Sequence, residues 1–169
     1  MSGHITEKRQ LETVDGPMDV FVSTPLEDIR GGVVVVQEAF GLTGHIQRVC
    51  EAVADGGYVA VAPALFHRSD DQLFGYSDYD KLGPVIMTMT RATIEVDVDA
   101  AFAELVRLRV PADKLAIMGF CFGGTVTLET AARLELAAAI TFYGGGLGEG
   151  RFGLSPGIES AARLRTPWL

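Results

Sequence analysis

The chain has 169 residues and a formal net charge of −8; 48% of its residues are apolar and 21% are charged. This length and balance are typical of one globular domain, here residues 1–169, with a hydrophobic core of its own. The acidic excess and the lack of a Lys/Arg cluster argue against nucleic-acid binding, which requires a basic surface.

Apolar segments are too short for a membrane protein. The longest purely apolar runs, 31–36 and 137–140, fall well below the ~20 residues of a membrane-spanning helix. Residues 1–9 lack the apolar core of a secretory signal, so we expect a cytoplasmic protein without a membrane partner. Cys50 and Cys121 are too few for a disulfide framework, and no Cys/His spacing matches a zinc site. We therefore expect no metal and no cofactor, while homo-oligomerisation stays open.

Strand and helix patterns alternate along the chain, which predicts an α/β fold with a mostly parallel sheet and helices on both faces. Two short strands, 4–12 and 18–24, are expected to form an antiparallel edge pair. The β-branched run 31–37 is typical of a strand buried on both faces. The later expected elements are a helix at 45–54, a strand at 58–62, a helix at 94–109, a strand at 115–118, a helix ending near Leu134 and a strand at 137–142.

Residues 65–83 are polar, aromatic and interrupted by glycine, which indicates a long segment outside the sheet. Such a segment can line an active site, and a plain surface loop explains it equally well. In the helix that follows, residues at helical spacing form one apolar stripe, which we expect in the core. The stripe consists of Val98, Ala101, Phe102, Leu105 and Leu108.

The most informative stretch is Gly119-Phe-Cys-Phe-Gly123, which follows an expected buried strand and begins a helical pattern. This is the layout of a nucleophile elbow, with Cys121 in place of serine. Because the turn is sharp, Gly119 and Gly123 must be small to let strand and helix pack closely. The helix dipole would favour a Cys121 thiolate. The N–H of Phe122 would then point at a developing oxyanion.

Two other interpretations apply to the same turn. Cys121 could be a small buried apolar residue, and a glycine-rich strand-to-helix turn could cradle a phosphate. The phosphate interpretation lacks both a Gly-Lys-Ser/Thr ending and a Gly-x-Gly-x-x-Gly pattern. The motif and its context therefore favour a nucleophile.

Glu38 follows the buried strand in the segment Gln37-Glu-Ala-Phe-Gly41. A carboxylate at the C-terminal end of a central parallel strand lies where α/β sheets bind ligands. In isolation, a solvated glutamate at a strand end would be the simpler explanation. Its occurrence together with the Cys121 motif favours a functional role.

Four segments in chain order resemble the dienelactone hydrolase family: Gln-Glu-Ala-Phe-Gly, Gly-Tyr-Val-Ala-Val-Ala-Pro-Ala-Leu-Phe, Gly-Phe-Cys-Phe-Gly-Gly and Phe-Tyr-Gly-Gly145. The resemblance runs from about Pro17 to the last residue. It implies an α/β-hydrolase fold and cleavage of a small ester or lactone through an acyl-enzyme on Cys121. It also implies that Glu38 holds the resting thiol, and that the N–H groups of Ala39 and Phe122 form the oxyanion hole.

The remainder of a catalytic triad does not follow the nucleophile. This fold supplies its triad in the order nucleophile, acid, histidine, yet no Asp or His follows Phe122. His45 begins an expected helix, whereas His67 lies in the 65–83 segment and could approach a site. The final Thr-Pro-Trp-Leu169 is typical of the start of another core strand. We therefore expect a part of a longer chain, inactive alone and truncated before its last strands; a domain-swapped or partner-supplied completion is the alternative.

Candidate pocket residues are fewer and less specific. By the resemblance, members that act on dienelactone bind its carboxylate with arginines, and Arg68 is the candidate here. Aromatic residues could line the pocket or simply pack the loops: Phe40, Tyr76, Tyr79 and Tyr143.

Three functional interpretations follow. The first is a cysteine-nucleophile hydrolase of small esters or lactones, and the second is a non-catalytic α/β binding module or inactive remnant. The third, a phosphate-binding flavodoxin-like domain, predicts a ligand at the Gly123 helix start and no role for Glu38. Cys50, on the apolar side of an early helix, is expected to be buried and unreactive.

Overall fold

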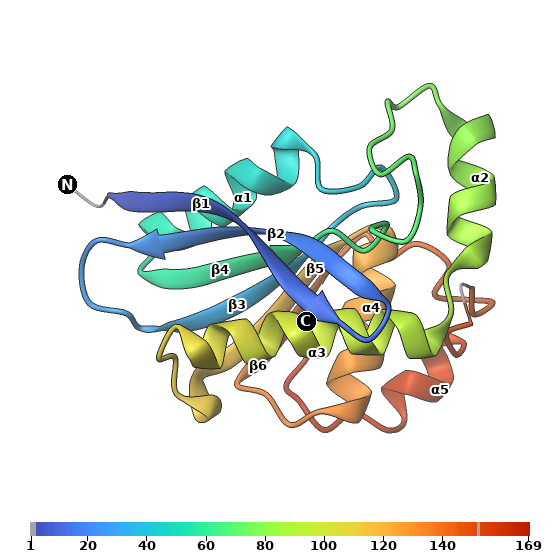
Figure 1. The fold of residues 1–169 in the computed structure, drawn as a ribbon. Helices are drawn as coiled ribbons and strands as arrows, with labels where there is room; N and C mark the ends of the chain where they lie inside the picture. The colour runs from blue at the N-terminus through green and yellow to red at the C-terminus, as the bar shows by residue number, and fades with distance from the viewer. Residues whose placement is uncertain (1–2, 152) are drawn as a thin grey trace.

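The structure is a computed structural model that describes residues 3–151 and 153–169. Its centre is a six-stranded sheet with the order β1-β2-β4-β3-β5-β6 (Figure 1). The β1–β2 and β2–β4 pairs are antiparallel, whereas the β4–β3, β3–β5 and β5–β6 pairs are parallel. This confirms the predicted α/β fold. The strands are β1 (His4–Thr13), β2 (Gly16–Pro25), β3 (Gly31–Val36), β4 (Tyr58–Pro63), β5 (Leu115–Phe120) and β6 (Ala138–Phe142).

Helices cover both faces of the sheet (Figure 1). Helix α3 (Arg91–Arg107) and helix α4 (Phe122–Arg133) contribute Val98 and Val126 to the larger apolar cluster. Helix α1 (Gly44–Asp55) contributes Ile46 and Cys50 to a second cluster on the opposite face. The remaining elements are α2 (Tyr79–Thr88), a 3₁₀ turn (Ala112–Lys114) and α5 (Gly157–Ala161). No helix in the described parts of the chain is both long and apolar enough to cross a membrane.

The burial of β3 and α3 follows from their sequence patterns. Val34, Val35 and Val36 are fully buried because helices lie on both faces of this central strand. The predicted α3 stripe is buried too, except that Leu108 is the C-cap residue and only partly buried. The helix begins at Arg91, earlier than predicted, because the side chains of Thr90 and Thr93 form a reciprocal capping box.

Helix α2 is the main departure from the predicted elements, since it occupies part of the segment predicted to be irregular. Pro84 lies inside it and removes one intrahelical hydrogen bond, so the Gly83-Pro84 pair has the appearance of a helix breaker. Packing of Leu82, which is only 4% exposed, helps to hold the helix in place. The short helix α5 was also not predicted.

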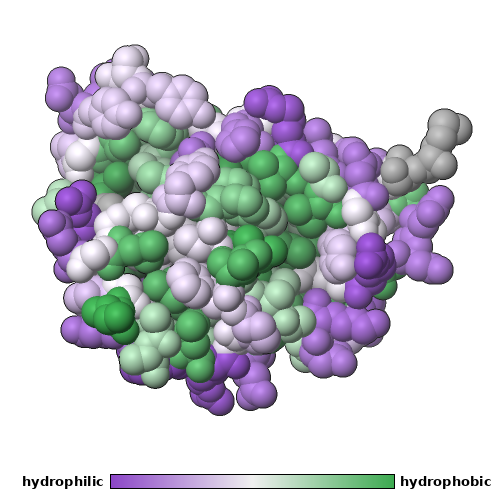
Figure 2. All heavy atoms as spheres, turned by 180° about the vertical axis from the view of Figure 1, so that it is seen from behind, coloured by the Kyte–Doolittle hydropathy of each residue, from purple (hydrophilic) through white to green (hydrophobic). Residues whose placement is uncertain are grey.

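The last residues lie beside β6. Ala139 donates to the carbonyl of Pro167, and Leu169 donates back to Ala139, giving a parallel bridge at Trp168. On the α1 side, Met118 of β5 is half-buried and Phe142 of β6 is 40% exposed. Figure 2 shows apolar side chains spread across the middle of this side of the molecule.

Candidate active site

Two predicted site residues, Glu38 and Cys121, lie at the carboxyl edge of the sheet. Strands β3 and β5 are parallel neighbours, with Val36 opposite Gly119. Glu38 and Cys121 each come two residues after these positions, so both emerge at the same edge. This is the edge at which open α/β sheets bind ligands.

Cys121 forms a strained turn between β5 and α4. Its φ is +52° and its ψ is −116°, a combination that non-glycine residues rarely adopt. Its N–H donates to the carbonyl of Phe142, and its carbonyl accepts from Gly124 and Gly145. These bonds fix the backbone, and the side chain remains partly accessible.

The turn depends on its two flanking glycines. A Cβ on Gly119 would lie 2.1 Å from the carbonyl oxygen of Gly123. A Cβ on Gly123 would lie 2.5 Å from the carbonyl oxygens of both Val36 and Gln37. The first turn of α4 therefore packs against the end of β5, as the sequence predicted, and also against the end of β3, which was not predicted. This contact sets the separation between the Cys121 turn and the Glu38 segment.

Glu38 is a buried carboxylate with one bonded oxygen. The side chain is 7% exposed, and its Oε1 accepts a hydrogen bond of 3.1 Å from the hydroxyl of Tyr143. Its Oε2 is buried and has no hydrogen-bond partner among the described residues. A buried carboxylate oxygen without a donor is unfavourable, so this atom is suited to accept a proton or a hydrogen bond from an incoming group.

The backbone around Glu38 is held from both sides. The buried side chain of Gln37 donates to the Glu38 carbonyl and accepts from the N–H of Leu65, linking β3 to the segment after β4. Gly41 has φ +93°, and a Cβ there would meet the carbonyl of Gln72 at 2.1 Å. Neither role was predicted; the uncharged Gln37 at the end of an otherwise apolar strand was the available signal.

Tyr143 faces Glu38 rather than lying loose in a loop. Its φ of +38° places it in the left-handed region. Desolvation, followed by the hydrogen bond to Glu38 and the nearby charges of Glu38, Cys121 and Tyr76, raises the pKa of Tyr143 to about 12. The phenol is therefore a hydrogen-bond donor at neutral pH. Sequence reasoning placed this residue only in the pocket lining.

Gly145 lies next to the thiol, which sequence reasoning did not identify. A Cβ at this position would approach the Cys121 Sγ at 3.2 Å and the Phe122 nitrogen at 3.5 Å. Glycine therefore leaves space beside the sulfur and the first amide of α4. The second glycine of the Phe-Tyr-Gly-Gly145 segment was the available signal.

The predicted aromatic residues form one cluster beside Glu38. The Phe40 ring meets Tyr76 edge-on, with centroids 4.6 Å apart, and Tyr79 at 6.0 Å. Both tyrosines are largely exposed. Ala39, between Glu38 and Phe40, borders a groove along α2.

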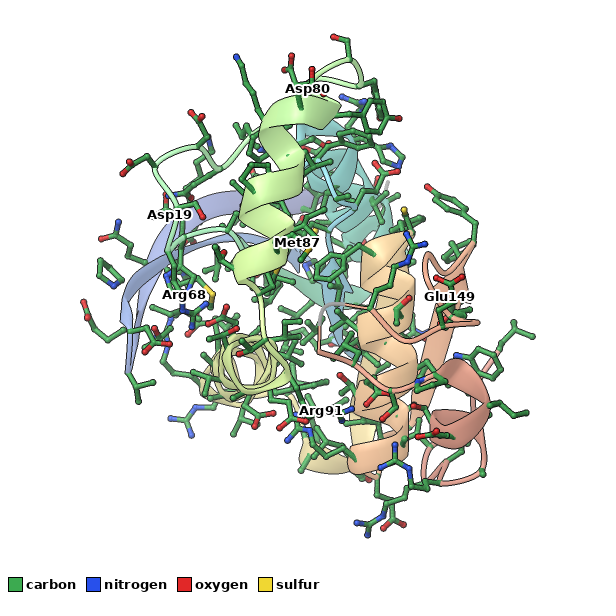
Figure 3. The ribbon with its side chains drawn as sticks, turned by 90° about the vertical axis from the view of Figure 1, so that its right-hand side faces the viewer. Asp19, Arg68, Asp80, Met87, Arg91 and Glu149 are labelled. Atoms are coloured by element: carbon green, nitrogen blue, oxygen red, sulfur yellow. The ribbon has the colours of Figure 1, made fainter. Side chains whose placement is uncertain are left out.

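Arg68 is held in a different cluster. Its guanidinium binds both carboxylate oxygens of Asp97 on α3, at 2.7 and 2.8 Å, and also binds Asp15. Figure 3 shows Arg68 near the β1–β2 hairpin, on the opposite side of the view from Glu149, which follows β6. The structure thus places Arg68 in an ion-pair cluster and does not bring it together with the Glu38 aromatics.

Each of the three histidines contacts a different partner. His67 shares Asp97 with Arg68, at 3.1 Å, and is buried. His4 is paired with Asp55 at the start of the sheet. His45, in the first turn of α1, packs edge-on against Phe120. Within the described residues, no group of three or more His, Cys, Asp or Glu side chains could hold a metal ion.

Known proteins are similar in sequence over much of the chain. A Yersinia pestis protein named as an inferred carboxymethylenebutenolidase is 36% identical over 122 residues, covering 69% of this chain and 44% of its own length. A Methylorubrum extorquens protein of the same name is 32% identical, covering 99% of this chain and 59% of its own length. The chain thus spans about half of the length of these relatives.

Solved structures match the fold. A Klebsiella pneumoniae protein described as an inferred dienelactone hydrolase has a TM-score of 0.88 at 29% identity, over 98% of this chain and 70% of its own. A dienelactone hydrolase-like promiscuous phosphotriesterase, P91, from metagenomic libraries has a TM-score of 0.69 at 27% identity, over 96% of this chain and 66% of its own. The family description of dienelactone hydrolases matches residues 18–169. The chain therefore belongs to the dienelactone hydrolase family.

Proposed function

We propose that the protein acts on small carboxylic esters or lactones through an acyl-cysteine intermediate at Cys121. The observation that carries the proposal is the pairing of a strained Cys121 turn with a buried Glu38 at one sheet edge. The unpartnered Oε2 of Glu38 is suited to receive the thiol proton. A phosphate-binding turn would not need this carboxylate, which would repel the ligand.

In the proposed acylation, Glu38 accepts the Cys121 proton and the thiolate attacks the substrate carbonyl carbon. The carbonyl oxygen becomes an oxyanion that accepts hydrogen bonds from the N–H groups of Ala39 and Phe122. Collapse of the intermediate breaks the C–O bond, and the leaving oxygen takes the proton that Glu38 received from Cys121, which returns Glu38 to its carboxylate form. An ester thus yields an alcohol and a thioester, whereas a lactone yields a single ring-opened thioester.

Tyr143 acts on Glu38 in this scheme. Its hydroxyl donates to Oε1, which leaves Oε2 to accept the thiol proton. Deacylation requires water and a base, and the histidines of this chain are bound to Asp55, Asp97 or packed on Phe120. We therefore propose that these 169 residues form the acyl-enzyme and release the acyl group slowly.

Mass spectrometry of the intact protein after incubation with p-nitrophenyl acetate tests this proposal. We expect one acetyl group, on Cys121, and none on the Cys121→Ala variant. Cys50 is the internal control: it is fully buried, and desolvation, followed by the charge of Glu51, raises its pKa to about 12. A thiol with so high a pKa is a poor nucleophile at neutral pH.

The competing function, a non-catalytic α/β module, predicts a different result. In that case Cys121 would react no faster than a small free thiol, and replacing Glu38 with Gln would not change its rate. Acetylation that depends on Glu38 supports the hydrolase, and equal slow labelling of both cysteines overturns it.

A further inference from the structure

Helix α2 carries an apolar stripe that the core does not fully cover. Its members follow the i, i+3, i+4, i+7, i+8 spacing of one helix face: Tyr79, Leu82, Gly83, Ile86 and Met87. Leu82 is buried, but Tyr79 is 64% and Met87 is 83% exposed. On α3 the equivalent stripe is buried against the sheet. The α2 stripe therefore faces open space over part of its length.

That open space is a groove of about 680 Å³ lined by the α2 stripe, Ala39 and Arg151. Its volume and mostly apolar lining are typical of a small-molecule site. The single charged member, Arg151, lies with its methylenes across Gly146 and its guanidinium 3.2 Å from Glu149. Figure 3 shows Met87 on α2 and Glu149 on the loop after β6.

One end of the groove is lined by Ala39, the residue after Glu38. Ala39 directly follows Glu38 and is a proposed oxyanion donor, and Tyr79 at the start of α2 contacts Phe40. From Tyr79 to Met87 the stripe runs about 12 Å along the helix. A chain attached to the reacting carbonyl could thus lie against apolar side chains over several methylene groups.

We propose that this groove binds an extended apolar chain of the substrate, so that the protein favours esters of medium-length aliphatic groups over acetates. This inference rests on the proposed function for the position of the reacting carbonyl. The stripe would supply apolar contact, and Arg151 would close the side opposite α2. The apolar chain belongs either to the acyl part or to the alcohol part of the ester, and two series of substrates distinguish these cases.

The first test measures acylation of Cys121 by mass spectrometry, so that turnover is not needed. One series lengthens the acyl group of p-nitrophenyl esters from acetate to hexanoate, and a second lengthens the alcohol of aliphatic acetates. A buried methylene raises the rate about two- to fourfold, so the hexanoate should exceed the acetate by about tenfold or more. Dependence on length in either series supports the groove and identifies the part that it binds.

Two variants of opposite character should weaken this preference. Met87→Glu places a charge in the lining, and Gly83→Leu fills the groove, because a Cβ at Gly83 meets no atom within 4 Å. Each should lower the ratio of hexanoate to acetate rates about tenfold. Because Pro84 follows Gly83 and restricts a larger residue there, the melting temperature of that variant is measured as well. Val106→Glu, at a half-exposed position on α3, is the matched control and should keep the wild-type ratio.

Binding is also measured without chemistry, in the Cys121→Ala variant with ¹³C-methyl-labelled methionine. Titration with 2-octanone should shift the Met87 methyl resonance in a saturable way, whereas titration with acetone should not shift it. The methyl resonance of the buried Met18 should not move with either ketone. A shift of the Met87 signal without acylation of the wild type would contradict the proposed function and support the groove as a binding site. Acylation that does not depend on chain length, together with an unchanged Met87 signal, would refute the groove as a binding site and support the proposed function.

Discussion

Gly123 is the contact through which α4 and β3 set the geometry of the site, and Gly123→Ala perturbs that contact alone. The added Cβ would lie 2.5 Å from two backbone carbonyl oxygens, those of Val36 and Gln37. Neither oxygen can rotate away, so the helix or the strand end must move. Overpacking of this kind costs about 1–3 kcal/mol. Alanine has a higher helix propensity than glycine, which offsets up to about 1 kcal/mol of this loss in the free energy of unfolding.

Because both clashing atoms belong to the backbone, we expect the upper part of that range and a net loss of about 2 kcal/mol. For a chain of this size, that corresponds to a fall in melting temperature of about 4–8 °C. Thermal unfolding followed by circular dichroism measures it, with Gly148→Ala as the control, since a Cβ at Gly148 meets nothing within 4 Å. Labelling of Cys121 should also slow, because the turn moves away from Glu38.

The reasoning fails if Gly123→Ala melts at the wild-type temperature and labels at the wild-type rate. That result would mean that α4 does not press on the end of β3. A loss of stability with unchanged labelling would confirm the contact and separate it from the reactivity of Cys121.

Two further substitutions test the charged and polar contacts. Asp97→Asn should lower the free energy of unfolding, measured by urea denaturation, by about 3 kcal/mol, the lower end for a broken buried ion pair, because Arg68 still binds Asp15. The control is Asp55→Asn at the exposed pair with His4, which should lose less than about 1 kcal/mol. Equal losses in the two variants would contradict the argument from burial. Tyr143 should ionise near pH 12, above its ordinary value of 10. The stability linked to this shift, which arises first from desolvation and then from the hydrogen bond to Glu38, is fully present below pH 10 and is lost between pH 10 and 12. The amount is small because Tyr143 is 64% exposed. The difference in tyrosinate absorbance between wild type and Tyr143→Phe gives the midpoint, and a midpoint near 10 would contradict the shift that desolvation and the Glu38 hydrogen bond together produce.

Sequence patterns predicted the sheet well because its strands satisfy strong local rules. The run of valines in β3 can be buried on both faces only in the middle of a parallel sheet. Helix α2 was missed for an equally local reason: Gly83-Pro84 lowers the helix propensity of a segment that tertiary packing nevertheless holds. The amphipathic spacing around the pair was the stronger signal, and it is also the feature that lines the groove.

The placement of the candidate site residues was predictable where the signal lies in adjacent residues. Cys121 and Glu38 were proposed because each follows a strand and lies in a short motif, and both lie at one edge of the sheet. The Tyr143 contact joins residues 105 positions apart, and a left-handed loop conformation aims the side chain, which no local pattern specifies. Arg68 is the opposite case: the structure pairs it with Asp97, which lies beside an apolar helix stripe and is fully buried. The sequence does not indicate that the Asp97 carboxylate forms an ion pair with the Arg68 guanidinium.

The two halves of the site are held by different kinds of structure. Cys121 and Glu38 follow neighbouring strands, and backbone contacts at Gly123 together with the Gln37 side chain fix them. Changes there should therefore affect folding and reactivity together. Helix α2 joins the core through Leu82 and Ile86, and Tyr79 at its start contacts Phe40, whereas the exposed side chains of Tyr79 and Met87 contribute little to the core. Substitutions at Tyr79 and Met87 should consequently alter which esters react while leaving stability nearly unchanged, which is how one fold can serve different substrates.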